Sequence, residues 1–366
     1  MTDLQTFLKE IMAVPGLSGY EAPVRQVLES HWAPLTDQLD TSRIGSLHGL
    51  KRGTLPEPRP SVLLAAHMDT IGLMVTKITN GFLRFTEVGG LDPRVLPGQP
   101  VTVHGRQDLP GLIIQPPPRL LPPSAQTGPV PMEYLLIDTG LPVEEVSRLV
   151  RSGDLVSFAQ SPLETGGENL AGPYLDNRAS VAALTYCLQS LQNRPHAWDV
   201  WAVATAQEEE TLGGAATSAF QLRPTLAIAI DVTFAASPGS PSHLTYPLGK
   251  GPAIGWGPNI HPYLHKTFKD LAEQLEIPYH TEVLPRLSGT DAITLQVAAE
   301  GIPTMVLSIP VRYMHTPVEM VSIKDIRRAG RLLAEFICQL APDFMDKISW
   351  NDPEVLSNQE EKALLR

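Results

Sequence analysis

Residues 61–67 have the sequence SVLLAAH, a nearly unbroken apolar run that ends in a histidine. A run of this length without polar alternation is typical of a strand that is buried on both faces of a sheet. Three similar runs follow along the chain: VWAVATA (200–206), LAIAIDV (226–232) and TMVLSIP (304–310). The sequence therefore predicts four central strands of one covered sheet.

Segments with helical spacing of apolar residues lie before, between and after these strands. In the first segment, Leu4, Leu8 and Ile11 would share one face of a helix. The expected helices cover residues 2–14, 20–32, 178–192, 214–221, 263–276 and 323–340. Because apolar strands alternate with helices, the sequence predicts the α/β fold class.

The segment between residues 70 and 165 has a different pattern, with short strand candidates between Gly and Pro turns and one helical stretch near 142–151. The strand candidates are 71–78, 82–88, 100–105, 111–115 and 154–159. Residues 116–131 (PPPRLLPPSAQTGPVP) contain too many prolines for a helix or strand, and we expect a mobile surface loop there. We therefore expect a β-rich domain at 70–165, inserted into an α/β domain made of 1–69 and 166–345. A polar extension, 346–366, would follow.

The composition narrows the class of protein. The chain has 366 residues, of which 43% are apolar, and a net charge of −11 from 28 basic and 39 acidic residues. This apolar content allows a sizeable core, and the acidic balance argues against nucleic acid or an anionic membrane surface as a partner. We expect no membrane span, because no run of about 18 apolar residues occurs. The N-terminal sequence has no signal-peptide pattern, so we expect a cytoplasmic protein.

Several catalytic motifs are missing from the sequence. We find no G-x-S-x-G elbow, no Walker A loop, no G-x-G-x-x-G after a strand and no H-E-x-x-H helix. The two cysteines, Cys187 and Cys338, are too few for a disulfide framework or a thiolate metal cluster.

Imidazole and carboxylate side chains gather instead at the ends of predicted strands and at one helix start. They are His67, Asp69, Asp176, Glu208, Glu209, Glu210, Asp231 and His315. Ligands of open α/β sheets bind beyond the carboxyl ends of the strands, so we expect these side chains to converge on one site.

Taken singly, each residue has a simpler explanation: Asp176 would cap a helix, the glutamates would be solvated, and the histidines would lie in loops or the core. Taken together, they carry an excess of negative charge, because only Arg178 and Arg312 are basic nearby. Burying unpaired carboxylates is costly, and a divalent metal would balance their charge.

The number of donors favours two metals rather than one. Two imidazoles and at least three carboxylates exceed the four ligands of one tetrahedral zinc, and nitrogen and oxygen donors fit zinc, cobalt or manganese. A metal pair lowers the pKa of a bridging water and supplies hydroxide near neutral pH. Hydrolysis also needs a base that does not bind metal, and the adjacent Glu208 and Glu209 can divide these two tasks.

Eight motifs run in order along the chain: 65–72 (AAHMDTIG), 88–99 (VGGLDPRVLPGQ), 174–180 (YLDNRAS), 206–210 (AQEEE), 230–233 (IDVT), 249–262 (GKGPAIGWGPNIHP), 288–292 (SGTDA) and 311–326 (VRYMHTPVEMVSIKDI). With these motifs the sequence resembles the glutamyl aminopeptidase family of dinuclear metallopeptidases, which includes the tetrahedral and deblocking aminopeptidases. The likeness extends from about residue 3 to residue 345. It implies a zinc-peptidase-like catalytic domain, with a mixed sheet covered by helices. It also implies that the inserted domain is used for self-association, from a dimer up to a dodecamer.

The resemblance also implies a role for each candidate ligand. His67 and Asp231 would hold one metal, Glu209 and His315 would hold the other, and Asp176 would bridge the two. No other cofactor is implied.

Two further residues receive roles from the same resemblance. Glu208 would be the general base and acid, and Asp69 would orient the His67 imidazole. The chain departs from the family pattern at Thr211 and Gly213, in place of a glycine and an arginine, and at Ser288, in place of a glycine. These changes remove no ligand, but they concern the substrate pocket and a subunit contact.

We therefore expect a metal-dependent aminopeptidase that removes N-terminal residues from peptides with a dimetal-bound hydroxide. An N-acyl amino acid deacylase or carboxypeptidase would use the same metals on other substrates. A glycoside hydrolase with a carboxylate pair, an activity attached to members of this family, would leave His67 and His315 without a role. A non-catalytic scaffold would leave the whole set unused.

Overall fold

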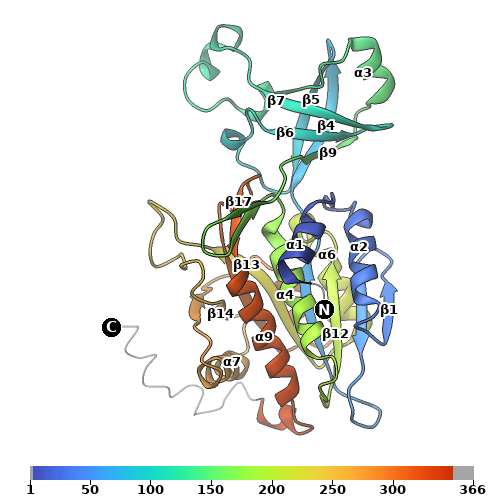
Figure 1. The fold of residues 1–366 in the computed structure, drawn as a ribbon, viewed down its shortest axis with the longest axis vertical. Helices are drawn as coiled ribbons and strands as arrows, with labels where there is room; N and C mark the ends of the chain where they lie inside the picture. The colour runs from blue at the N-terminus through green and yellow to red at the C-terminus, as the bar shows by residue number, and fades with distance from the viewer. Residues whose placement is uncertain (1–2, 349–366) are drawn as a thin grey trace.

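Strand β3 (Ser61–His67) lies near the middle of a large mixed sheet. The computed structural model describes residues 3–348, and this sheet of eleven strands occupies the lower part of Figure 1. Its main path runs, in spatial order, through β1 (Gln38–Thr41), β2 (Leu47–Lys51), β12 (Asp199–Thr205), β3, β13 (Leu226–Phe234), β16 (Thr304–Arg312), β17 (Glu319–Ser322), β11 (Asn169–Gly172) and β10 (Leu163–Thr165). Strand β14 (Ala253–Trp256) pairs with β16 and with β15 (His280–Val283).

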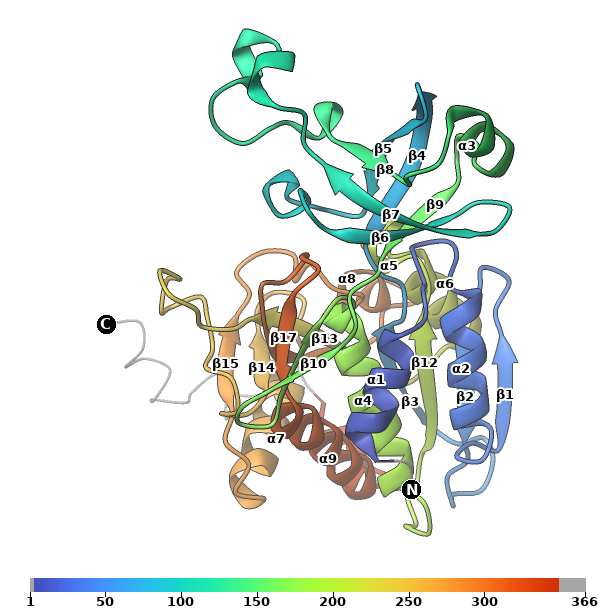
Figure 2. The same cartoon turned by 45° about the horizontal axis from the view of Figure 1, so that its top comes forward.

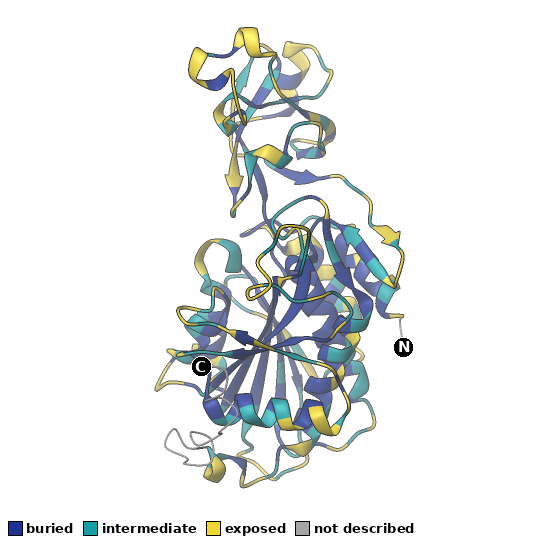
Figure 3. Ribbon diagram, turned by 90° about the vertical axis from the view of Figure 1, so that its left-hand side faces the viewer, coloured by how far each residue is buried: buried dark blue, intermediate teal, exposed yellow. Residues whose placement is uncertain are grey.

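The four predicted apolar runs form the parallel centre of this sheet. Strands β12, β3, β13 and β16 are direct neighbours and pair in parallel. Leu63, Ala202 and Ile228 are fully buried there, and the buried strands are the dark blue arrows in Figure 3. The outer strands β2, β17 and β11 pair antiparallel, so the sheet is mixed. The predicted α/β fold class is confirmed.

Helices cover both faces of the sheet (Figure 2). Helices α1 (Leu4–Met12), α2 (Ala22–Trp32), α4 (Leu175–Ser190) and α9 (Ile323–Gln339) lie in front of it in this view, and α6 (Gly213–Leu222) and α8 (Ala292–Gln296) lie behind it. Helix α7 (Pro262–Gln274) packs against α9 and β14, and the short α5 (Glu208–Thr211) precedes α6. All six helices expected for this part of the chain are present, with ends that differ by at most a few residues. They bury their apolar faces against the strands, which leaves the strand ends for polar side chains.

Six strands close a small barrel at the top of Figure 1. They are β4 (Gly72–Thr79), β5 (Phe82–Val88), β6 (Pro100–His104), β7 (Asp108–Ile114), β8 (Leu136–Asp138) and β9 (Leu155–Phe158), and helix α3 (Val143–Leu149) precedes β9. The barrel has its own apolar core, to which Leu73, Val103 and Ile137 belong. The domain boundaries expected at residues 70 and 165 stay a prediction.

The proline-rich segment 116–131 forms neither an α-helix nor a strand and is mostly exposed, in agreement with the surface loop predicted for it. It contains two short 3₁₀ turns, η2 (Pro118–Leu120) and η3 (Pro123–Ala125), and η4 (Met132–Tyr134) follows directly. Leu121, Ala125 and Val130 are buried in the barrel core. Proline fixes φ near the value that such turns need, so the prolines shape these turns and anchor the segment.

The remaining short turns are η1 (Pro93–Val95) and η5 (Phe344–Lys347). The polar extension predicted at 346–366 lies outside the described residues from residue 349 onward. Among the helices of residues 3–348, none combines the length and apolar character that crossing a membrane requires. Cys187 and Cys338 are free thiols.

Candidate metal centre

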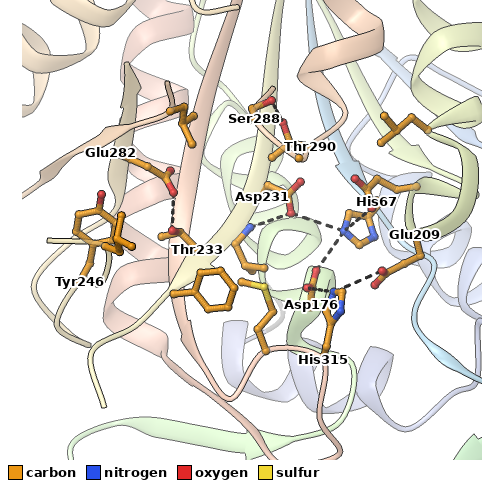
Figure 4. A pocket seen from close by; sticks show the side chains of 18 of the residues that line it. His67, Asp176, Glu209, Asp231, Thr233, Tyr246, Glu282, Ser288, Thr290 and His315 are labelled. Atoms are coloured by element: carbon orange, nitrogen blue, oxygen red, sulfur yellow. Dashed lines mark hydrogen bonds and ion pairs between the residues drawn. The ribbon is translucent and has the colours of Figure 1, made fainter. Parts of the chain in front are cut away.

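The carboxyl ends of β3, β12, β13 and β16 border a pocket of about 600 Å³. Its lining includes six of the side chains predicted from the sequence: His67, Asp176, Glu208, Glu209, Asp231 and His315. Figure 4 shows His67, Asp176, Glu209, Asp231 and His315 turned toward one another. Segments that are far apart in the sequence thus meet at one end of the sheet, as the strand-end argument predicts.

His67 is the last residue of β3 and is 2% exposed. Its Nε2 atom lies 3.2 Å from Oδ1 of Asp176, 3.6 Å from Oδ1 of Asp231 and 3.8 Å from Oε2 of Glu208. Its Nδ1 atom lies 3.1 Å from the backbone carbonyl oxygen of Asp69, which can accept the ring N–H. This contact leaves Nε2 free to act as a ligand.

His315 approaches the other side of the same carboxylate. Its Nε2 atom lies 3.4 Å from Oδ2 of Asp176 and 3.5 Å from Oε2 of Glu209. The ring also donates a hydrogen bond to the backbone carbonyl of Gly90, in the segment that leads out of the barrel strand β5. Asp176 therefore presents one oxygen to each imidazole, which is the arrangement expected of a bridging ligand.

Asp176 does not cap a helix, contrary to the simpler explanation of this residue. It lies inside the first turn of α4, where its backbone (φ −80°, ψ 105°) and that of Asn177 are not helical. Tyr174 occupies the N-cap position, and no side chain caps this helix. The irregular turn directs the Asp176 carboxylate into the pocket.

Asp69 contacts the glutamate segment more closely than it contacts the His67 ring. Its Oδ1 and Oδ2 atoms accept the backbone N–H groups of Glu208 (3.0 Å) and Glu209 (3.1 Å), whereas Oδ1 lies 3.6 Å from Nδ1 of His67. Gln207, the residue before Glu208, has a left-handed backbone (φ 60°). Asp69 thus fixes the turn from which both glutamates enter the pocket.

The pKa values in the pocket are strongly perturbed by burial and by the neighbouring charges. Burial and the nearby carboxylates raise the pKa of Glu208 to about 9, and burial also raises the pKa of Glu209 and of Asp231. Burial opposes ionisation of Asp176, but hydrogen bonds from His315 and His67 hold its pKa below the usual range. Burial would lower the pKa of His67, but Glu208 and the other acids raise it. A cation placed among these buried carboxylates would stabilise their ionised forms.

The donor set fits a divalent cation. One ligand atom from each of His67, Asp176 and Glu209 can be chosen so that all three lie within 4.8 Å of one another. Oε1 of Glu209 is buried and has no hydrogen-bond partner within residues 3–348. Imidazole nitrogens and carboxylate oxygens without a thiolate are ligands that suit zinc, cobalt or manganese.

The sequence analysis missed two buried acids beside the pocket. Glu319, the first residue of β17, accepts the backbone N–H of Asp176 (3.0 Å) and of His315 (2.9 Å). Asp291 accepts the hydroxyl of Thr205 (2.5 Å). Glu319 lies in the family motif at 311–326 and Asp291 in the one at 288–292. Their place in these motifs was the only feature of the sequence that could have pointed to them.

The fold and the donor set together indicate a metal-dependent enzyme of the α/β class, with helices on both faces of its sheet. The family model described as M42 glutamyl aminopeptidase matches residues 45–332, and the chain belongs to this family. The predicted family resemblance is confirmed, and the protein is a metal-dependent aminopeptidase.

The similarity to known proteins extends over almost the whole chain. The lysyl aminopeptidase of Pyrococcus furiosus is 34% identical over 343 residues, which are 92% of this chain and 97% of that protein. The solved structure of an aminopeptidase from the archaeon Desulfurococcus kamchatkensis is similar with a TM-score of 0.87 and 32% identity, covering 94% and 97% of the two chains. The TET1 peptidase of Pyrococcus horikoshii, which can assemble into a tetrahedron or a large octahedral shell, is similar with a TM-score of 0.81 and 31% identity, covering 92% and 100%.

Proposed function

We propose that this aminopeptidase binds two divalent metal ions, with zinc as the first choice and cobalt or manganese as substitutes. His67 and Asp231 would hold one ion, Glu209 and His315 the other, and Asp176 would bridge them. The observation that carries this proposal is that each oxygen of Asp176 faces a different imidazole nitrogen, at 3.2 and 3.4 Å. A single metal would leave part of this donor set without a role.

A bound metal pair supplies two chemical effects: it acidifies a water and polarises the scissile carbonyl. We assign the proton transfers to Glu208. Its carboxylate lines the pocket beside the proposed ligands, with Oε2 3.8 Å from Nε2 of His67. It would take the proton from the attacking water and give it to the leaving amine.

Asp69 and Glu319 would be positioning residues in this mechanism. Asp69 holds the backbone of Glu208 and Glu209, so it fixes the base and one ligand relative to each other. Glu319 holds the backbone of Asp176 and His315, the proposed bridge and one terminal ligand. Small shifts of such groups reduce catalysis strongly, because reacting atoms must be aligned.

A panel of aminoacyl anilides, tested with zinc, cobalt and manganese in turn, examines the proposal directly. We expect chelator-sensitive release of the aniline from substrates with a free N-terminal amine, and no hydrolysis of N-acetylated amino acids. Hydrolysis of the N-acetylated compounds alone would favour the deacylase. Chelator-insensitive cleavage of a cellulose oligomer would favour the glycoside hydrolase, which gives His67 and His315 no role.

We also propose that peptides are the substrates and that the chain self-associates through the barrel. The assemblies of the TET1 peptidase of Pyrococcus horikoshii support self-association. Native mass spectrometry of the full chain should show a dimer or a larger assembly, and a monomer at micromolar concentration would contradict this part of the proposal. The cytoplasmic location expected from the sequence stays a prediction.

A further inference from the structure

The pocket that holds the proposed metal ligands has two unlike sides. Figure 4 shows His67 and Glu209 on one side, with Tyr246 and Glu282 on the other. The lining away from the acids is mainly apolar, and it includes Phe234, Leu244, Val283, Leu284 and Met314. The acids and imidazoles of the pocket are the proposed metal ligands and base. The proposed mechanism uses none of the apolar side chains.

A second cavity of about 370 Å³ continues this apolar side. Phe234, Leu244 and Met314 line both cavities. The second cavity is completed mainly by small or apolar residues, among them Ala235 and Val311. The end of β13, which carries Asp231, and the end of β16, which precedes His315, both contribute to it. An apolar space thus adjoins the pocket that contains the proposed metal ligands, and the two share Phe234, Leu244 and Met314.

The side chains at the border of the two cavities are unusually exposed for their type. Phe234 is 59% exposed and Leu244 is 56% exposed. Single exposed apolar residues are ordinary on a protein surface, but these two face a concave space next to an active site. A ligand with an apolar group would remove their surfaces from water, and this transfer is favourable.

The charged groups of the pocket disfavour the other classes of side chain. Among the described residues that line the two cavities, none is a lysine or an arginine, so an acidic side chain would find neither of these partners there. Both carboxylate oxygens of Glu282 already accept hydrogen bonds from within the protein. Its Oε1 and Oε2 atoms accept the hydroxyl groups of Thr233 and Ser308, each at 2.5 Å, and burial raises its pKa.

We propose that the enzyme selects peptides with an apolar N-terminal residue, and that Phe234 and Leu244 bind the side chain of that residue. The N-terminal residue carries the scissile carbonyl, so its side chain must lie beside the metal ligands, where the second cavity opens. This inference rests on the proposed aminopeptidase function. It assigns to this chain a preference that differs from the glutamyl and lysyl names of the family and of one relative.

The test compares leucyl, phenylalanyl, lysyl and glutamyl anilides on the metal-loaded full-length enzyme. Anilides have no second amino acid, so a preference among them reports on the N-terminal residue alone. We expect kcat/KM to be at least about tenfold higher for the leucyl and phenylalanyl substrates than for the other two. Leu244→Ala and Phe234→Ala should raise KM for the leucyl anilide several-fold. Leu163→Ala, which truncates a leucine of similar exposure (63%) on β10 outside both cavities, should not.

A gain of function completes the test. Leu244→Lys places a cation at the border of the two cavities and should raise kcat/KM for the glutamyl anilide relative to the leucyl anilide. The inference is wrong if the lysyl or glutamyl anilide is the best substrate of the unmodified enzyme, or if Leu244→Ala leaves the order of preference and KM unchanged. If none of the four anilides is cleaved with any metal, the proposed two-metal mechanism itself has failed, which is a distinguishable result.

Discussion

Glu319 accepts the backbone N–H of Asp176 at 3.0 Å through Oε2, although 143 residues separate the two in the chain. Its other oxygen accepts the backbone N–H of His315 at 2.9 Å, and the residue is 1% exposed. One buried carboxylate therefore holds the backbone of the proposed bridging ligand and of one terminal ligand. We therefore expect the proposed metal centre to depend on Glu319, although this residue is not among those that line the pocket.

Glu319→Gln replaces one acceptor oxygen by an amide NH₂ group that would face a backbone N–H. We expect metal affinity to fall about 10- to 100-fold, as is usual when a group that orients metal ligands is lost. The measurement is a zinc titration of metal-free protein against a competing chelator. Glu300→Gln, on a side chain that is 77% exposed, is the matched control. Equal zinc affinity in both variants would mean that Glu319 is only a structural residue.

Glu208→Gln should retain the metals and lose turnover by about 10²- to 10⁴-fold, the usual contribution of a general base. Elemental analysis and the anilide assay measure the two properties on the same sample. Glu210→Gln is the control, because Glu210 is exposed and accepts the backbone N–H of Gly89 (2.7 Å), a contact that glutamine can keep. Loss of metal from Glu208→Gln would show that our division of roles between Glu208 and Glu209 is wrong.

His67→Ala and His315→Ala should each lower the metal content, because each removes the imidazole next to one oxygen of Asp176. His243→Ala, which removes an exposed imidazole outside the pocket lining, should leave the metal content unchanged. Full metal occupancy in either of the first two variants would refute the ligand assignment of that histidine.

His48 gives a pH dependence of stability that is separate from the metal centre. It is 2% exposed, its Nε2 atom lies 2.8 Å from Oγ of Ser218, and burial lowers its pKa to about 4. Below pH 6.5 the unfolded chain binds a proton at this residue and the folded chain does not, so the free energy of unfolding falls as the pH falls toward 4. At pH 5 the loss relative to pH 8 is about 2 kcal/mol from this group.

Urea unfolding of the unmodified protein and of His48→Gln, each at pH 5 and pH 8, isolates this contribution. Glutamine can still hydrogen-bond to Ser218 but does not titrate, so the variant should lose less stability on acidification. An identical pH dependence of the two proteins would show that His48 is protonated in the folded state.

The centre of the sheet could be predicted from the sequence because its four strands are buried on both faces. Their apolar runs are long enough to be recognised without any knowledge of their neighbours. The edge strands could not be predicted in this way. Strands such as β1 (Gln38–Thr41) and β17 (Glu319–Ser322) have four residues each, and only pairing with a distant segment makes them strands.

The residues that point into the pocket could be predicted for a similar reason. His67 and Asp231 lie at or near the carboxyl ends of recognisable strands, and such ends share one edge of the sheet. Glu319 and Asp291 act through contacts with Asp176 and Thr205, which are 143 and 86 residues away. No local pattern encodes such contacts, so the sequence showed these two acids only as parts of family motifs.

Anomalous diffraction from crystals of the zinc-loaded, active enzyme would show whether two metal ions share the Asp176 carboxylate. We expect two zinc peaks about 3.5–4 Å apart, the usual spacing of a catalytic metal pair, with the Asp176 carboxylate between them. One peak in the pocket of fully active enzyme, or two peaks that do not share Asp176, would contradict the account.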